Sequence, residues 1–262
     1  MSLVGASLVK LVWRPAATRT LLLLGGLVLI TYALMGAMVL QAPDATMRAQ
    51  LQVTLVFPGA LGTMSGLVVV FAGIAGAAFG GIVAGSEWSW NTYRVALTRG
   101  ESRVRYVIGL FVALAIVTLA AWLLLYVFGM VVIVVAGLLT GTSSGNPIDP
   151  SVLGQHIALV LTGWWAILMQ LALAFAISFI SRSTVAGVAV VMVLIMAELV
   201  AVAFVPVEVL QWLPFNSSSS LVKIAGLSGL DPALALPLAV TTAYMLVALL
   251  AAAFVARRSE VA

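Results

Sequence analysis

Long apolar runs make up most of the chain, and short polar stretches separate them. A run of about 20 apolar residues is long enough to cross the hydrocarbon core of a bilayer as a helix. Six such runs follow one another, so we expect six membrane-spanning helices. Their predicted bounds are roughly 20–40, 57–84, 106 onward, 155–180, 184–205 and 237–256.

The third run is too long for one ordinary span, because no charged residue occurs over positions 107–148. Two spans joined by a turn near Gly129 are one interpretation. They would place the loop 140–154 on the same side of the membrane as the charged stretch 85–105. That loop contains Asp149 and neither Lys nor Arg, which is typical of an external loop. We therefore favour one long, tilted helix and keep the two-span alternative open.

Composition supports a membrane protein. The chain of 262 residues is 64% hydrophobic and 8% charged, with a mean hydropathy of +1.24. A soluble domain has about 25% charged residues and needs them to form its polar surface. The predicted fold class is therefore an all-α integral membrane protein. The net charge of +4 fits a membrane protein, so we expect the lipid bilayer and no nucleic acid as a partner.

The basic residues divide unequally between the two sides of the six-span topology. Two of them, Arg48 and Lys223, fall on the external side. The remaining ten fall on the side of the termini: Lys10, Arg14, Arg19, Arg94, Arg99, Arg103, Arg105, Arg182, Arg257 and Arg258. Because Lys and Arg favour cytoplasmic loops, we predict a multi-pass protein of the inner (plasma) membrane with both termini in the cytoplasm.

The N-terminal segment 1–19 has the pattern of a helix lying in the membrane interface. Leu8 and Leu11 share one apolar face, whereas Lys10 and Arg14 lie off that face. The proline that follows separates this helix from the first span. A frayed tail is the alternative.

Small residues recur every four positions in the second span, at Ala72, Gly76, Gly80 and Ala84. This spacing places them on one face of a helix, where another helix can approach closely. The contact lies either inside the bundle or at a subunit interface or moving contact.

Candidate chemistry is sparse. A phosphate-binding loop needs Lys followed by Ser or Thr, yet Lys10 precedes Leu and Lys223 precedes Ile. The chain therefore does not bind ATP by that route, and we expect it not to be an enzyme by itself. His156 is the only histidine and cysteine is absent, so no typical zinc site, disulfide or thiolate metal site is predicted. We assign no catalytic and no metal-binding residue.

Two polar residues lie within predicted spans. Glu198 is the charged residue placed furthest inside, and Gln170 is a polar group in the fourth span. An intramembrane carboxylate must be paired, protonated or exposed to water. Both residues are candidates for a substrate path, while for Glu198 the alternative is a position near the external headgroups. The segment 206–236 that follows is predicted to be external, re-entrant or interfacial, with a short helix over 221–230.

The stretch 85–105, "GSEWSWNTYRVALTRGESRVR", holds six of the twenty charged residues. Ser86 is predicted to cap a short helix that has Glu87 in its first turn and ends at Gly100. Ser102 then starts the next helix. The stretch is either a basic cytoplasmic loop with two tryptophan anchors, or a short helix that docks on a soluble partner.

This stretch resembles the segment after the second span of ABC-2 type permeases, the membrane subunits of one class of ATP-binding-cassette exporters. Glu87 matches the family's glutamate, Asn91-Thr92 stands at its Gly-Thr, and Ala96-Leu97 at its leucine pair. Residues 100–103, "GESR", replace a Pro-x-Ser-Arg element. Residues 210–216, "LQWLPFN", resemble in part the Pro-Phe/Asn-Pro element before the last span.

The resemblance implies the six-helix fold of type V exporter permeases, also called type-2 ABC exporters, with 86–100 as the coupling helix that seats in a groove of the ATPase. The residues implied in coupling are Glu87, Trp90, Asn91, Thr92, Tyr93, Arg94, Arg99 and Arg103.

The implied assembly contains two copies of a separate ABC ATPase subunit and two permeases, either a homodimer or a heterodimer. No cofactor is expected in this chain, since ATP and Mg²⁺ would bind the partner subunit. The expected function is export of a hydrophobic or amphiphilic substrate: a drug, antibiotic, peptide or lipid. A stand-alone secondary transporter or channel and a non-transporting membrane scaffold are the alternatives.

Overall fold

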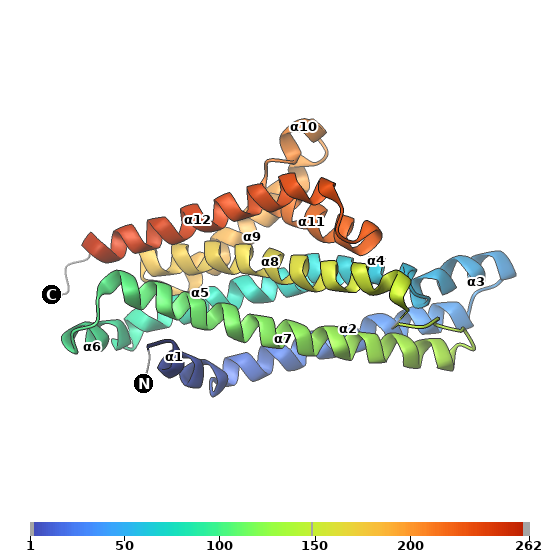
Figure 1. The fold of residues 1–262 in the computed structure, drawn as a ribbon, viewed down its shortest axis with the longest axis horizontal. Coiled ribbons are helices and arrows are strands. Elements are labelled where there is room, and N and C mark those ends of the chain that lie inside the picture. The colour runs from blue at the N-terminus through green and yellow to red at the C-terminus, as the bar shows by residue number, and fades with distance from the viewer. Residues whose placement is uncertain (1–2, 148, 259–262) are drawn as a thin grey trace.

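The computed structural model describes residues 3–147 and 149–258, and all regular secondary structure in these ranges is helical. Within them, six helices are long and apolar enough to cross a membrane, as predicted. Five of the spans each correspond to one helix. These helices are α2 (Pro15–Leu40), α7 (Arg103–Leu139), α8 (Pro150–Ser181), α9 (Thr184–Ala201) and α12 (Ala235–Arg258). The remaining span, second along the chain, joins α4 (Gly59–Leu67), the π-helical η2 (Val68–Ala72) and α5 (Gly73–Ser89). The spans run along the long axis of the molecule (Figure 1).

Shorter helices lie at the two ends of this bundle. Helix α1 (Leu3–Val12), α6 (Thr92–Thr98) and the C-terminal end of α12 lie at one end, which we call the α6 end (Figure 1). Helix α3 (Ala45–Gln52) lies at the other end and leads into η1 (Val53–Leu55). The connection from α9 to α12 contains α10 (Val207–Leu210), α11 (Pro214–Ser228) and η3 (Pro232–Leu234).

The third span is one continuous helix of 37 residues, α7, so the two-span interpretation is wrong. The Ser102 hydroxyl accepts a hydrogen bond from the Arg105 backbone N–H at 3.3 Å and caps the helix start, as predicted. Gly129 forms no turn. A Cβ atom there would lie 2.7 Å from the end of the Met64 side chain, so the Met64 side chain of α4 packs against this glycine.

Helix α8 is the centre of the bundle and is the most buried of the six spans. It packs against α5, α7, α9, α11 and α12. One apolar core at the α6 end joins Leu11, Phe79, Leu110, Phe175 and Ala252 from five helices. A second core, between α2, α4, α7 and α8, continues toward the α3 end.

The row of small residues in the second span packs inside the bundle. A Cβ atom on Gly76 would lie 2.6 Å from Ile167, and one on Gly80 would lie 2.6 Å from the Leu171 carbonyl oxygen. Ala84 is fully buried and Ala72 is buried to 8% exposure. Most of the row therefore serves the close approach of α5 to α8, as the first alternative predicted.

The segment after α9 differs from its prediction. The expected helix over 221–230 begins earlier, at Pro214, and includes all four serines of the "SSSS" run. Proline suits a first helical position because its missing N–H would have no intrahelical partner there. Gly229, at a φ of 71°, ends the helix.

The basic residues predicted to share one side also share one end of the molecule. Arg103 donates a hydrogen bond to the Arg257 carbonyl at 3.1 Å, and the Arg182 guanidinium stacks over Trp88 at 4.4 Å. Arg48 lies instead in α3 and Lys223 in α11, which are away from this end (Figure 1). The cytoplasmic location of the α6 end remains a prediction from the count of basic residues.

Candidate functional site

The candidate site is built where the second span ends and α6 begins. Helix α5 continues to Ser89, so Ser86 and Glu87 lie in its last turn and the prediction that Ser86 caps a following helix is wrong. The Ser86 hydroxyl donates instead to the Val83 carbonyl oxygen at 2.8 Å. The chain turns at Asn91, which has a left-handed φ of 54°. Asparagine tolerates this conformation better than most residues do.

Helix α6 therefore begins at Thr92 rather than at position 86, and it contains seven residues. Gly100 follows it with a φ of 88°, in agreement with the predicted glycine stop. A side chain at such a φ is strained. The short helix thus lies between two left-handed residues, Asn91 and Gly100, so its orientation must be fixed by contacts rather than by regular backbone.

Glu87 is the centre of those contacts, and its side chain is fully buried. One carboxylate oxygen, Oε1, accepts hydrogen bonds from Lys10 Nζ at 2.5 Å and from Arg14 Nη2 at 3.4 Å. The other oxygen, Oε2, accepts from the Thr92 hydroxyl at 2.6 Å and from the Tyr106 hydroxyl at 2.5 Å. We call these five residues the Glu87 cluster.

A buried carboxylate is destabilising unless it is paired and hydrogen-bonded. Here two cations and two hydroxyl groups satisfy both oxygens. Burial lowers the pKa of Arg14, while the negative charge of Glu87 opposes that shift. The partners come from α1, the start of α2, α6 and α7, so one side chain at the end of α5 holds four other segments together.

Tyr93, the residue after Thr92, holds the same first turn of α6 against the bundle. It is fully buried, and its ring centroid lies 4.8 Å from that of Trp88, 5.4 Å from that of Phe179 and 5.5 Å from that of Tyr106. Its hydroxyl donates to the Ala256 carbonyl oxygen near the end of α12 at 3.5 Å. The buried face of α6 is therefore in contact with α5, α7, α8 and α12.

The other face of α6 is exposed, and we define the α6 surface as Trp90, Asn91, Arg94, Val95 and Arg99. Trp90 is 60% exposed and Val95 is 47% exposed. Asn91, Arg94 and Arg99 are exposed as well. The surface combines apolar area with two cations, and the Arg14 guanidinium stacks over Trp90 at 4.8 Å.

Seven of the eight predicted coupling residues therefore divide into two groups, and Arg103 belongs to neither. Glu87 and Tyr93 are buried, and Thr92 belongs to the Glu87 cluster. Trp90, Asn91, Arg94 and Arg99 lie on the α6 surface. Arg103 is half-buried and bonds the end of α12.

Three members of the Glu87 cluster, Lys10, Arg14 and Tyr106, were not among the predicted site residues. The sequence does carry a signal for two of them. Lys10 and Arg14 are four positions apart and form a basic pair before the first span. Glu87, at the end of the second span, is one of only eight acidic residues in the chain. Pairing them across more than 70 positions required the structure.

The predicted substrate-path residues lie apart from this site. Glu198 is half-buried and accepts backbone N–H groups of Phe215 at 3.1 Å and Asn216 at 2.8 Å, at the start of α11. It lines a surface cavity that does not include Gln170. Gln170 is 2% exposed and faces Gly73, where an added Cβ would lie 2.2 Å from its side chain. The structure therefore does not join the two residues into one path.

Among the described residues, no group of three or more His, Cys, Asp or Glu side chains lies close enough to hold a metal ion. No protein-family model matches the chain, and a search of curated proteins gives no match.

Proposed function

We propose that this chain is the permease subunit of an ABC exporter and that the α6 surface is its docking site for a separate ATPase subunit. The observation that carries the proposal is the two-sided construction of α6. Its outer face is free to bind a partner, and its inner face is held by a buried charge cluster and buried aromatic rings. A helix held in this way can pass a displacement to the spans.

The chemistry of the two faces supports this role. The α6 surface offers Trp90 and Val95 as apolar contacts and Arg94 and Arg99 as cations, which would suit a groove with an apolar floor and acidic edges. Movement of α6 would pull on α5 through its short connection, on α7 through Tyr106 and on α12 through Tyr93. The work would come from the partner, because this chain lacks a phosphate-binding loop.

We further propose a hydrophobic or amphiphilic substrate. The spans are apolar on nearly all faces, and polar side chains such as Thr118 and Thr162 hydrogen-bond backbone carbonyls of their own helices. Such spans would interact poorly with an ion or a sugar. By the same proposal, two copies of this chain would assemble with two ATPase subunits, which bind ATP and Mg²⁺.

The test is purification of the full-length chain from its native membranes, with identification of any bound protein that carries a Walker-motif ATPase domain. We expect such an ATPase to co-purify. The variants Arg94→Glu and Val95→Glu should each lower its recovery about tenfold or more, because a charge is reversed or introduced at a buried contact.

Arg105→Glu is the matched control, since it reverses the charge of an exposed arginine at the same end but outside α6. It should leave the recovery of the ATPase unchanged. If both α6 variants recovered as much ATPase as the unchanged chain does, the docking assignment would be overturned. Transport by the purified chain in vesicles without an ATPase would instead support a stand-alone secondary transporter or channel.

A further inference from the structure

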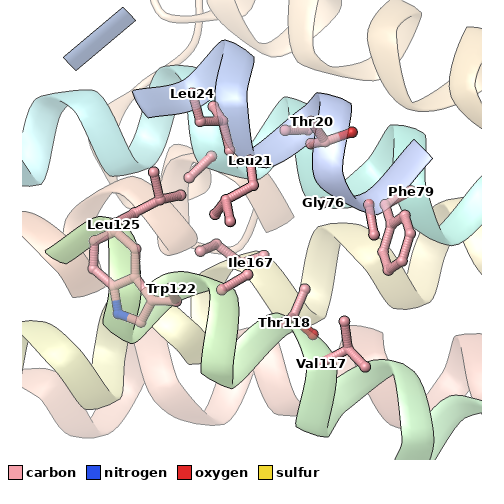
Figure 2. A pocket seen from close by; sticks show the side chains of 14 residues that line it. Thr20, Leu21, Leu24, Gly76, Phe79, Val117, Thr118, Trp122, Leu125 and Ile167 are labelled. Atoms are coloured by element: carbon pink, nitrogen blue, oxygen red, sulfur yellow. The ribbon is translucent and has the colours of Figure 1, made fainter. Parts of the chain in front are cut away.

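A cavity lies between α2, the second span, α7 and α8, and none of its lining residues belongs to the α6 surface. It has a volume of about 60 Å³, several times the space that one water molecule needs. Figure 2 shows Leu21 and Leu24 of α2 on one side, Val117 and Trp122 of α7 on another, and Ile167 of α8 behind them. All of its walls are membrane-spanning helices.

The lining of this cavity carries no charged side chain. Two of its polar groups are already bonded, because the Thr118 hydroxyl donates to the Leu114 carbonyl and the Trp122 indole N–H donates to the Val160 carbonyl at 3.0 Å. Thr20 carries the other hydroxyl of the lining. An apolar cavity of this kind stays dry, because water would find too few polar partners. Its natural occupant is a hydrocarbon.

A second, smaller cavity of about 20 Å³ lies beside the first, further along α2. The two share Leu24, Ala72, Trp122 and Leu125 in their linings. We call the pair the α2 seam. It follows α2 from Ala17 to Val28, which is about 16 Å at 1.5 Å per residue. That length is about half of the ~30 Å hydrocarbon core, or one leaflet.

Small side chains produce the space in the seam. Ala72 and Ala75 are contributed by the second span, and Ala121 is contributed by α7. Gly76 cannot be larger, because a Cβ there would collide with Ile167. Ala72 is the last residue of the π-helical segment η2, and such segments are frequent at functional sites. One wall of the seam thus includes a π-helical turn within the second span.

The seam is also open to the outside of the bundle. Leu21 and Leu24 of α2 and Ala121 of α7 are partly exposed. The neighbouring Leu22 and Leu23 are 69% and 74% exposed. In a membrane-spanning helix, the medium against such leucines is the lipid chains themselves. An acyl chain can therefore enter the seam sideways without leaving hydrocarbon.

We propose that the α2 seam binds one acyl chain of a membrane lipid from the leaflet at the α6 end. The chain lies along α2 and fills the space between α2, the start of α5 and α7. This inference does not depend on the transport proposal, because it concerns the lipid bound by the resting chain.

The test uses the full-length protein in phosphatidylcholine vesicles that contain a trace of phosphatidylcholine with a photoreactive diazirine in one acyl chain. After illumination, peptide mapping locates the labelled residues. We expect labelling of Leu21, Leu24 and Trp122 to exceed that of the exposed Leu22 and Leu23. A lipid held in a cavity stays beside its neighbours longer than a lipid that diffuses past an open surface.

Adjacent alanines on α7 provide a matched pair of variants. Ala121 lines the seam, whereas Ala120 is exposed outside it. Ala121→Leu should lower labelling of the seam about tenfold, since loss of two or three buried methylenes suffices for that factor. Ala120→Leu should leave labelling unchanged. Ala75→Leu, from the opposite wall, provides a second test if Ala121→Leu fails to fold.

Equal labelling of the seam and of the exposed leucines would overturn the proposal, as would equal effects of the two α7 variants. An unlabelled seam would overturn it as well, whether the cavity stays empty or a second copy of the chain covers it. Loss of ATPase co-purification from the α6 variants is a separate result, so the two proposals can fail independently.

Discussion

Two glutamates at opposite parts of the molecule use the same side chain in different ways. Glu87, at the α6 end, is fully buried and accepts hydrogen bonds from four side chains on four segments. Glu198, near the end of α9, is half-buried and accepts from two backbone N–H groups of one helix. The first glutamate joins elements distant in sequence, whereas the second caps a helix that begins 16 positions later.

The difference indicates how much structure depends on each residue. Loss of Glu87 would leave the buried Arg14 and the half-buried Lys10 without their carboxylate, so the whole α6 end should respond. Loss of Glu198 would free two backbone groups at the positive end of α11, where a carboxylate is favourable. We therefore expect a general effect at the α6 end and a local one at α11.

Glu87→Ala should have the largest effect. Removal of one partner from a buried ion pair costs about 3–5 kcal/mol, so the free energy of unfolding in mild detergent should fall by that amount. Glu87→Gln should lose less, because its amide oxygen still accepts a hydrogen bond. Glu101→Ala removes a carboxylate at the same end that lies outside the cluster, and it should change stability by less than about 0.5 kcal/mol. A Glu87→Ala effect equal to that control would contradict the assigned role of the cluster.

Glu198→Ala should have an intermediate and local effect. Loss of a helix cap costs about 1 kcal/mol, and we expect faster hydrogen exchange in the first turn of α11 with no change in α1 or α6. Glu208→Ala, at an exposed position in α10, is the control. Faster exchange at the α6 end in the Glu198 variant would show that the two regions are coupled and that the effect of Glu198 is not local.

Trp90→Ala should have the smallest effect on stability. It removes the stacking of Arg14 on an exposed ring, which is worth about 0.5–1 kcal/mol. By the proposed function, the same change should weaken ATPase binding far more than it weakens the fold. Trp13→Ala, which truncates an 83% exposed tryptophan, should alter neither property. A large loss of stability without loss of ATPase binding would place Trp90 in the fold rather than in the docking site.

The sequence was sufficient to predict the spans because their signal is local. Uncharged runs located all six, and the lack of basic residues in the loop 140–154 favoured the single helix α7 although the third run is unusually long. The cap at Ser102 and the stop at Gly100 were also predictable, since each depends on the chemistry of one residue. The start of α11 at Pro214 was missed, because the carboxylate that caps this helix comes from another span.

The site was harder to predict for the same reason. The resemblance singled out Glu87, but the expected cap at Ser86 placed that residue at the beginning of a helix rather than at the end of one. Ser and Glu fit both positions in local sequence, and the burial of the glutamate against α1 and α7 decides between them. The α2 seam was not predicted, although Ala72 and Gly76 of its lining belong to the row of small residues in the second span. Small residues form a cavity only when no other helix fills the space beside them.

The unequal lengths of α7 and α9 bear on hydrophobic mismatch. Helix α7 has 37 residues, about 55 Å, and must extend beyond a hydrocarbon core of ~30 Å at any ordinary tilt. Helix α9 has 18 residues, about 27 Å, and leaves no excess. Bilayer thickness should therefore act mainly on α9, where a thicker membrane would draw Glu198 and the first turn of α11 toward the lipid chains. The position of α7 should therefore depend little on bilayer thickness, whereas the position of α9 should respond to it.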